Sequence, residues 1–210
     1  TGTTADVEVS NIRLRTAKQT QSLGGDVGDV AVSINAGLNK IDLPAGASLK
    51  VEVTAQPTDD DRTAFTLAAQ GDNNEVTDIA YSITVTKTNL EDQTDVSDAF
   101  IDMTVSKAFV DSVGIDNVRI MRRADDGTVQ TLATTVLSQD ADGNVTFRGL
   151  SPDGLSVFAL TALQAQPTPE PPPTGDFAPG SGLMLALLVV GLLMVVGGTT
   201  YLMQARRTRA

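Results

Sequence analysis

The chain lacks cysteine, histidine and tryptophan, and only 4% of its 210 residues are aromatic. Without cysteine and histidine it cannot build thiol nucleophiles, Ser-His-Asp triads, imidazole proton relays or the usual zinc sites. The scarcity of aromatic side chains argues against a glycosidase cleft, which needs surfaces for stacking sugar rings. We therefore expect a protein that is not an enzyme and uses no cofactor. Its fold must depend on its core, because no disulfide can form.

Basic residues are also scarce, since 15 lysines and arginines stand against 26 aspartates and glutamates, for a net charge of −11. Three of the arginines, Arg206, Arg207 and Arg209, lie in the last five residues, which leaves 12 basic against 26 acidic residues in the rest. A body of this charge repels phosphates and anionic headgroups, so we expect no nucleic-acid partner.

Charged residues are absent from 22 consecutive positions, Gly182 to Met203. At about 1.5 Å per residue, a helix of this length crosses a hydrocarbon layer about 30 Å thick. The alternative, a buried core helix, seldom runs this long without a polar face. Tyr201 lies where interfacial aromatic residues usually lie, and the arginine-rich tail, residues 204–210, is typical of the cytoplasmic side. We predict a single transmembrane helix over residues 181–203 in the lipid bilayer, with the acidic body outside the cell.

A proline-rich stretch precedes this helix over residues 164–180, and residues 167–173 read Pro-Thr-Pro-Glu-Pro-Pro-Pro. Such a sequence favours polyproline II, which extends by about 3 Å per residue. We predict a stalk between the body and the membrane. The alternative, a ligand for SH3-type domains, is disfavoured by the extracellular placement.

Period-two alternation of apolar and polar residues dominates residues 1–163, and glycine-, proline- and aspartate-rich turns interrupt it. The pattern predicts an all-β fold, an antiparallel β-sandwich ectodomain with one short helix. The predicted strands are residues 7–15, 30–34, 49–53, 64–68, 79–86, 99–105, 118–122, 129–132, 135–137, 145–148 and 155–160.

The one predicted helix covers residues 107–113. Ser106 is placed to cap its first turn, and Gly114 is free to adopt the positive φ that ends it. Phe109, Val110 and Val113 would then face the core.

Two acidic stretches are candidates for cation sites. The sequence Asp-Ala-Asp-Gly-Asn at residues 140–144 is superficially similar to a calcium loop, but its glycine falls fourth where the loop needs it sixth. We therefore predict a hairpin turn there. Three adjacent aspartates at residues 59–61 are interpreted as a solvated turn, and neither stretch is assigned as a metal site.

Several short motifs in the second half of the body occur in order and at regular spacing. They are Thr88-Asn89-Leu90-Glu91-Asp92, Thr104-Val105-Ser106-Lys107-Ala108-Phe109-Val110, Asp116-Asn117-Val118-Arg119-Ile120, Leu132-Ala133-Thr134-Thr135-Val136 and Gly154-Leu155-Ser156-Val157-Phe158-Ala159. Together they resemble the PGF-pre-PGF domain found near the C-terminus of archaeal and some bacterial surface proteins. The resemblance covers about residues 75–163, with Phe109 where that family often has tryptophan. It implies a surface location ahead of a sorting or anchoring tail and brings no catalytic residues.

Two sequences before the predicted helix resemble sorting signals. Pro173, Thr174 and Gly175 lie in a segment similar to an LPXTG sortase signal, although Pro171 replaces the leucine that sortases read. Pro179-Gly180 is similar to the Pro-Gly-Phe signal of archaeosortase-type enzymes, although serine follows in place of phenylalanine. A sortase-type processing enzyme is therefore one expected partner. The alternative is that these are turn residues before a permanent helix.

The order of body, stalk, helix and basic tail predicts a non-catalytic anchoring module that displays distal parts of a larger envelope protein outside the cell. The alternative is an extracellular adhesion module whose sandwich loops bind a cell-envelope ligand.

Overall fold

The computed structural model describes residues 12–39 and 42–166. The predicted transmembrane helix, basic tail and both sorting signals lie outside these residues, as does the first part of the predicted strand 7–15. Within the described residues, no helix is long and apolar enough to cross a membrane.

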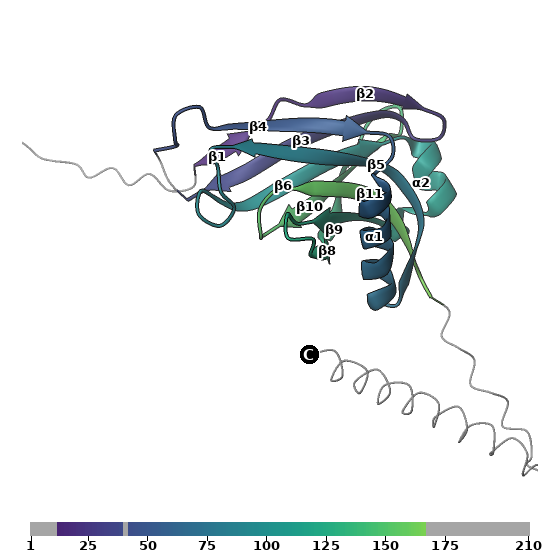
Figure 1. The fold of residues 1–210 in the computed structure, drawn as a ribbon. Helices are drawn as coiled ribbons and strands as arrows, with labels where there is room; N and C mark the ends of the chain where they lie inside the picture. Colours follow the sequence, from purple (N-terminus) through teal and green to yellow (C-terminus); the bar gives the residue numbers. More distant parts are fainter. Residues whose placement is uncertain (1–11, 40–41, 167–210) are drawn as a thin grey trace, which may run out of the picture. The chain divides into compact units, whose positions relative to one another are not determined.

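The described strands form two antiparallel sheets (Figure 1). The first sheet has the order β1-β3-β6-β10-β9, and β2 also pairs with β3; the second has the order β4-β5-β11-β7-β8. The prediction of an all-β sandwich is confirmed at this level. The strands of the first sheet are β1 (Arg13–Arg15), β2 (Gln19–Gly24), β3 (Gly28–Leu38), β6 (Val96–Val105), β9 (Ala133–Gln139) and β10 (Val145–Ser151). Those of the second are β4 (Ser48–Thr54), β5 (Asn74–Thr88), β7 (Val118–Arg123), β8 (Val129–Thr131) and β11 (Val157–Ala165).

The main core lies between the inward faces of the two sheets, where alternate residues of each strand are buried. Tyr81 of β5 spans this core, and its hydroxyl donates toward the carbonyl oxygens of Thr104 (3.1 Å) and Ala31 (3.3 Å) in the first sheet. The largest side chains in this core are Ile34, Tyr81, Ile83, Ile101, Met103, Phe109, Ile120, Phe147, Leu155 and Phe158.

The strand predicted over residues 64–68 is wrong, and so is the solvated turn at residues 59–61, because both segments belong to helix α1 (Asp59–Gly71). Thr58 caps the helix by accepting from the Asp61 amide at 3.1 Å. Three aspartates in the first turn suit the positive end of the helix dipole. The prediction that the body has only one helix is therefore also wrong. The alternation of residues 64–68 concealed Phe65 and Ala69, two buried residues at the i, i+4 spacing of a helix.

Helix α1 covers the outer face of the second sheet. Its buried residues Phe65 and Ala69 pack against Ile79, Met121 and Ala159 of that sheet in a second apolar cluster. The part of the second sheet around Ile79, Met121 and Ala159 is therefore buried on both faces, by the first sheet on one side and by α1 on the other.

The predicted helix over residues 107–113 is confirmed as α2 (Lys107–Val113). Ser106 accepts from the Phe109 amide at 3.2 Å, and Gly114 ends the helix with φ of 84°. Phe109 and Val110 are buried as expected, and Val113 packs at the margin of the core. A short 3₁₀ turn, η1 (Ile115–Asn117), leads into β7.

Candidate functional site

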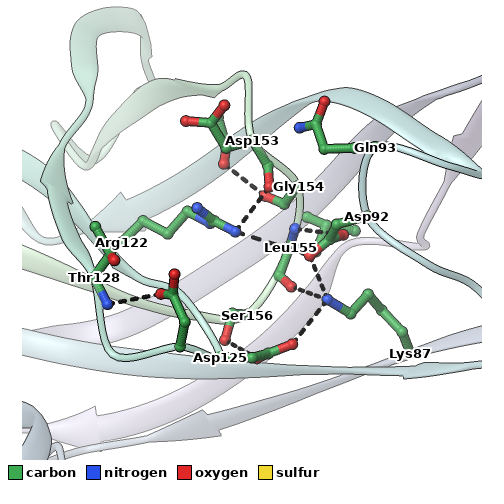
Figure 2. Close-up of polar contacts among 12 residues, drawn as sticks. Lys87, Asp92, Gln93, Arg122, Asp125, Thr128, Asp153, Gly154, Leu155 and Ser156 are labelled. Carbon is green, nitrogen blue, oxygen red and sulfur yellow. Dashed lines mark hydrogen bonds and ion pairs between the residues drawn. The ribbon is translucent and has the colours of Figure 1, made fainter.

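A cluster of charged and polar side chains lies where three connections meet at one end of the sandwich (Figure 2). Lys87 comes from the end of β5, Asp92 from the β5–β6 connection, Arg122 from β7, Asp125 from the β7–β8 turn and Ser156 from the β10–β11 connection. We call these five residues the end cluster. Two cations and two carboxylates give it a balanced formal charge.

Lys87 is the centre of the end cluster. Its ammonium donates to the Asp92 carboxylate at 2.5 Å, to the Leu155 carbonyl oxygen at 2.6 Å and to the Asp125 carboxylate at 3.2 Å. A lysine ammonium has three donors, so these contacts use all of them. Its side chain is only 12% exposed, and the charge is therefore held where water screens it poorly.

Arg122 occupies an inward position of β7, two residues after the core residue Ile120. It is 4% exposed, and its guanidinium donates to the Asp153 carbonyl oxygen at 2.9 Å and lies 3.8 Å from Asp92. Among the side chains of the described residues, two buried polar atoms have no hydrogen-bond partner, the Nε of Arg122 and the Oε1 of Gln130. Register places Arg122 directly opposite Gln130 in the β7–β8 ladder.

Asp125 and Ser156 form the outer part of the end cluster. The Ser156 hydroxyl donates to Asp125 at 2.5 Å. This hydrogen bond, followed by the contacts with Lys87, lowers the pKa of Asp125 against the opposing effect of burial. A carboxylate held in its ionised form is a weak base, and Ser156 is only 5% exposed. The pair is therefore suited to joining two loops and poorly suited to nucleophilic catalysis.

Gly154 allows these loops to approach each other. Its φ is +103°, and a Cβ at this position would lie 2.1 Å from the Asp92 side chain. Because glycine has no Cβ, the Asp92 carboxylate can lie against Gly154 and accept a hydrogen bond from the Leu155 amide at 3.0 Å. The two residues are 63 positions apart in the sequence. The end cluster thus fastens the beginning of β11 to the ends of β5 and β7.

Sequence reasoning missed the end cluster. The predicted strands 79–86, 99–105, 145–148 and 155–160 leave the connections between them unassigned, and alternation gives no means of pairing one connection with another. One local signal was present: Arg122 continues the inward series of Val118 and Ile120, and a charged residue at a core position requires a partner.

The hairpin turn predicted at residues 140–144 is confirmed. Asp140 accepts from the backbone amides of Asp142 (3.0 Å) and Asn144 (2.8 Å) and from the Asn144 side chain (2.9 Å). These bonds, the Asn144 side chain first, lower the pKa of Asp140. Within residues 12–39 and 42–166, no group of three or more acidic side chains is arranged to hold a metal ion.

Comparison with protein families, with curated proteins and with solved structures finds no match to this chain. The candidate sorting residues Pro173, Thr174, Gly175, Pro179 and Gly180 lie outside the described residues.

Proposed function

We propose that the chain is a non-catalytic spacer and anchoring module of a cell-surface protein. The β-sandwich is followed along the sequence by the predicted proline-rich stalk, the predicted transmembrane helix and the arginine-rich tail, in that order. The observation that carries the proposal is the position of the two ends of the folded body, because a module that separates other parts from a membrane must connect to them at opposite ends.

The chain enters and leaves the folded body at opposite ends (Figure 1). It enters through β1, where Arg13 lies 3.4 Å from Asp98 near the start of β6. Residues 89–95 connect Thr88, the last residue of β5, to the start of β6. The entry of the chain therefore lies near the end of β5. The chain leaves through β11, where Ala165 pairs with Asn74 at the beginning of β5. The 15 residues of β5 separate these points by up to about 50 Å at ~3.3 Å per residue.

The strand that leads toward the predicted stalk is well held. β11 is an interior strand of the second sheet, antiparallel to β5 on one side and β7 on the other. A pull along β11 would have to shear both ladders at once. The end cluster adds side-chain contacts at the beginning of the same strand. This arrangement supports a role in transmitting tension from the body to an anchor.

The length of the spacer can be tested in reconstituted vesicles. A fluorophore attached at Thr1 of the full chain should be far from an acceptor dye in the bilayer surface, so that energy transfer is weak. Deleting residues 13–165 should bring the fluorophore close to the dye and make transfer strong. Equal transfer in the two proteins would contradict a spacer role.

The fate of the predicted anchor can be read from the intact mass of the protein recovered from native membranes. A chain that ends at Thr174 indicates sortase-like cleavage, and a chain that ends near Gly180 indicates the archaeosortase-like route. A chain that retains Arg209 indicates a permanent anchor. β11 extends to Ala165, so the stalk can begin only after it, and a body recovered without residues 167–180 would contradict the stalk.

A further inference from the structure

A three-residue motif begins at the end of the β9–β10 hairpin. Asn144, Val145 and Thr146 read Asn-X-Ser/Thr, in which X is any residue except proline. In exported proteins this motif is the acceptor for asparagine-linked glycosylation. The chain has eight asparagines, and at the other seven the residue two positions later is neither serine nor threonine. Asn144 is therefore the one acceptor of this kind in the chain.

The fold turns Asn144 toward the outer face of the first sheet. Val145 and Phe147 belong to the main core, so the residues that alternate with them, Asn144 and Thr146, face the other way. Asn144 is half-buried there and lines a groove of about 470 Å³. Polar residues of this groove include Lys18, Thr20, Ser22, Asp29, Thr104 and Asp140. Their hydroxyl, ammonium and carboxylate groups suit hydrogen bonds to the hydroxyl groups of a sugar.

The hairpin allows the side-chain amide of Asn144 to carry a substituent. Asp140 holds the turn by accepting from the Asn144 backbone amide at 2.8 Å and from its Nδ2 at 2.9 Å. An amide nitrogen of this kind has two hydrogens, and one of them is enough for the bond to Asp140. A sugar that replaces the other hydrogen therefore leaves the turn intact.

We propose that Asn144 carries an asparagine-linked oligosaccharide whose first sugar lies in this groove. The inference rests on the proposed surface location, because such sugars are added to exported chains. In the reaction, Nδ2 of Asn144 bonds to the anomeric carbon of an oligosaccharide that a lipid phosphate carries. The bond from that carbon to the phosphate oxygen breaks, the lipid phosphate leaves with the electron pair, and Nδ2 gives up one proton. The attached sugar needs no aromatic surface for binding, because the covalent bond holds it beside the groove.

The folded body hides the second half of the motif. Thr146 supplies the hydroxyl that the motif requires. This hydroxyl is hydrogen-bonded to that of Thr104 in β6 at 2.9 Å, and Val145 beside it is only 2% exposed. Strand β10 is also an interior strand, paired with both β6 and β9. We therefore expect the sugar to be transferred before β10 joins the sheet. Modification of the purified, folded chain by an added transferase would contradict this order.

Mass spectrometry of one peptide tests the site. The full chain is recovered from native membranes and digested with trypsin, which cuts after Arg123 and Arg148. The peptide between these cuts, residues 124–148, contains no internal lysine or arginine and no asparagine besides Asn144. We expect this peptide to carry an oligosaccharide, and fragmentation to place it on Asn144. A sugar placed on a serine or threonine of the peptide would overturn the proposal.

Two matched variants separate the motif from the hydrogen bond that its threonine makes. Thr146→Val and Thr104→Val each remove one partner of the 2.9 Å contact between the two hydroxyls, so their effects on folding should be similar. Only Thr146→Val destroys the motif, and we expect it to lose the oligosaccharide completely. Thr104→Val and Thr146→Ser should keep it. An oligosaccharide that persists in Thr146→Val would overturn the assignment to this motif.

The position of the sugar in the groove is tested by the reactivity of two lysines. Lys18 lines the groove and is exposed, whereas Lys50 lies on β4 of the other sheet with a side chain that is 75% exposed. A sugar in the groove should make acylation of Lys18 several-fold slower in the natural chain than in Thr146→Val, and leave Lys50 unchanged. Equal rates at Lys18 in the two proteins would overturn the placement in the groove.

The proposed surface location is measured separately, by labelling Leu67→Cys in intact cells with a maleimide that does not cross membranes. An unmodified peptide from a body that is labelled would overturn the glycosylation site and leave the surface role in place. An unmodified peptide from a body that is protected would overturn the surface role and the site with it.

Discussion

The hydroxyl of Tyr81 in β5 donates to the carbonyl oxygen of Thr104 in β6, 3.1 Å away on the opposite sheet of the sandwich. Tyr81 is fully buried, and burial raises its pKa far above the ordinary range. The neutral hydroxyl is therefore the form that the fold requires. It gives the core a directional contact between sheets that otherwise meet through apolar side chains.

Removing this hydroxyl should weaken the fold without changing it. Tyr81→Phe is expected to lower the free energy of unfolding by about 1 kcal/mol, the net value of one buried hydrogen bond. Tyr81→Ala should cost about 4 kcal/mol, because it also leaves a cavity. Equilibrium denaturation with urea measures both. If Tyr81→Phe is as stable as the natural chain, the hydroxyl does not contribute to holding the two sheets together.

The end cluster can be tested with two lysines that differ in exposure. Lys87→Met leaves Asp92 in a poorly solvated position without its closest cation, so we expect a loss of about 3 kcal/mol. The control, Lys107→Met, breaks the Lys107–Asp111 pair, whose two side chains are 56% and 61% exposed. That change should cost no more than about 0.5 kcal/mol. Similar losses for the two variants would mean that the cluster is no stronger than a surface ion pair.

Two glycines with positive φ separate the effect of strain from the effect of crowding. Gly127 has φ of +88° and no atom within 4 Å of a Cβ, whereas Gly154 has φ of +103° and Asp92 in the way. Gly127→Ala should cost about 1 kcal/mol through strain alone. Gly154→Ala should cost about 2 kcal/mol more, because it also displaces Asp92 from the end cluster. Denaturation curves that coincide for the two variants would contradict the close approach of these loops.

Acid should weaken the body through Asp125. Its pKa is lowered in the folded state, chiefly by the Ser156 hydroxyl, so its stabilising effect is present above the unfolded pKa of about 4. The effect is lost as the pH falls through the lower folded value. Stability measured against pH should therefore decline below about pH 4, with a shallower decline in Asp125→Asn. A decline that is equally steep in the variant would exclude this carboxylate as a source of the acid sensitivity.

Features that depend on neighbouring residues could be read from the sequence, and those that depend on distant ones could not. Ser106 and Gly114 predicted both ends of α2, and alternation located most of the strands. The same alternation was misleading for residues 64–68, which belong to α1. There Phe65 and Ala69 lie on one face of a helix and pack against the second sheet. The end cluster could not be predicted from the sequence, because its contacts join residues as far apart as Asp92 and Leu155, which are separated by 63 positions.

The orientation of the chain across the membrane tests the central claim most directly. Because the natural chain has no cysteine, a single cysteine can be placed in the body at Leu67→Cys or in the basic tail at Thr208→Cys. Intact cells are treated with a maleimide that does not cross membranes, before and after permeabilisation. A membrane-anchored surface module predicts labelling of the body in intact cells and of the tail only after permeabilisation. Labelling of the tail in intact cells, with the body protected, would contradict it.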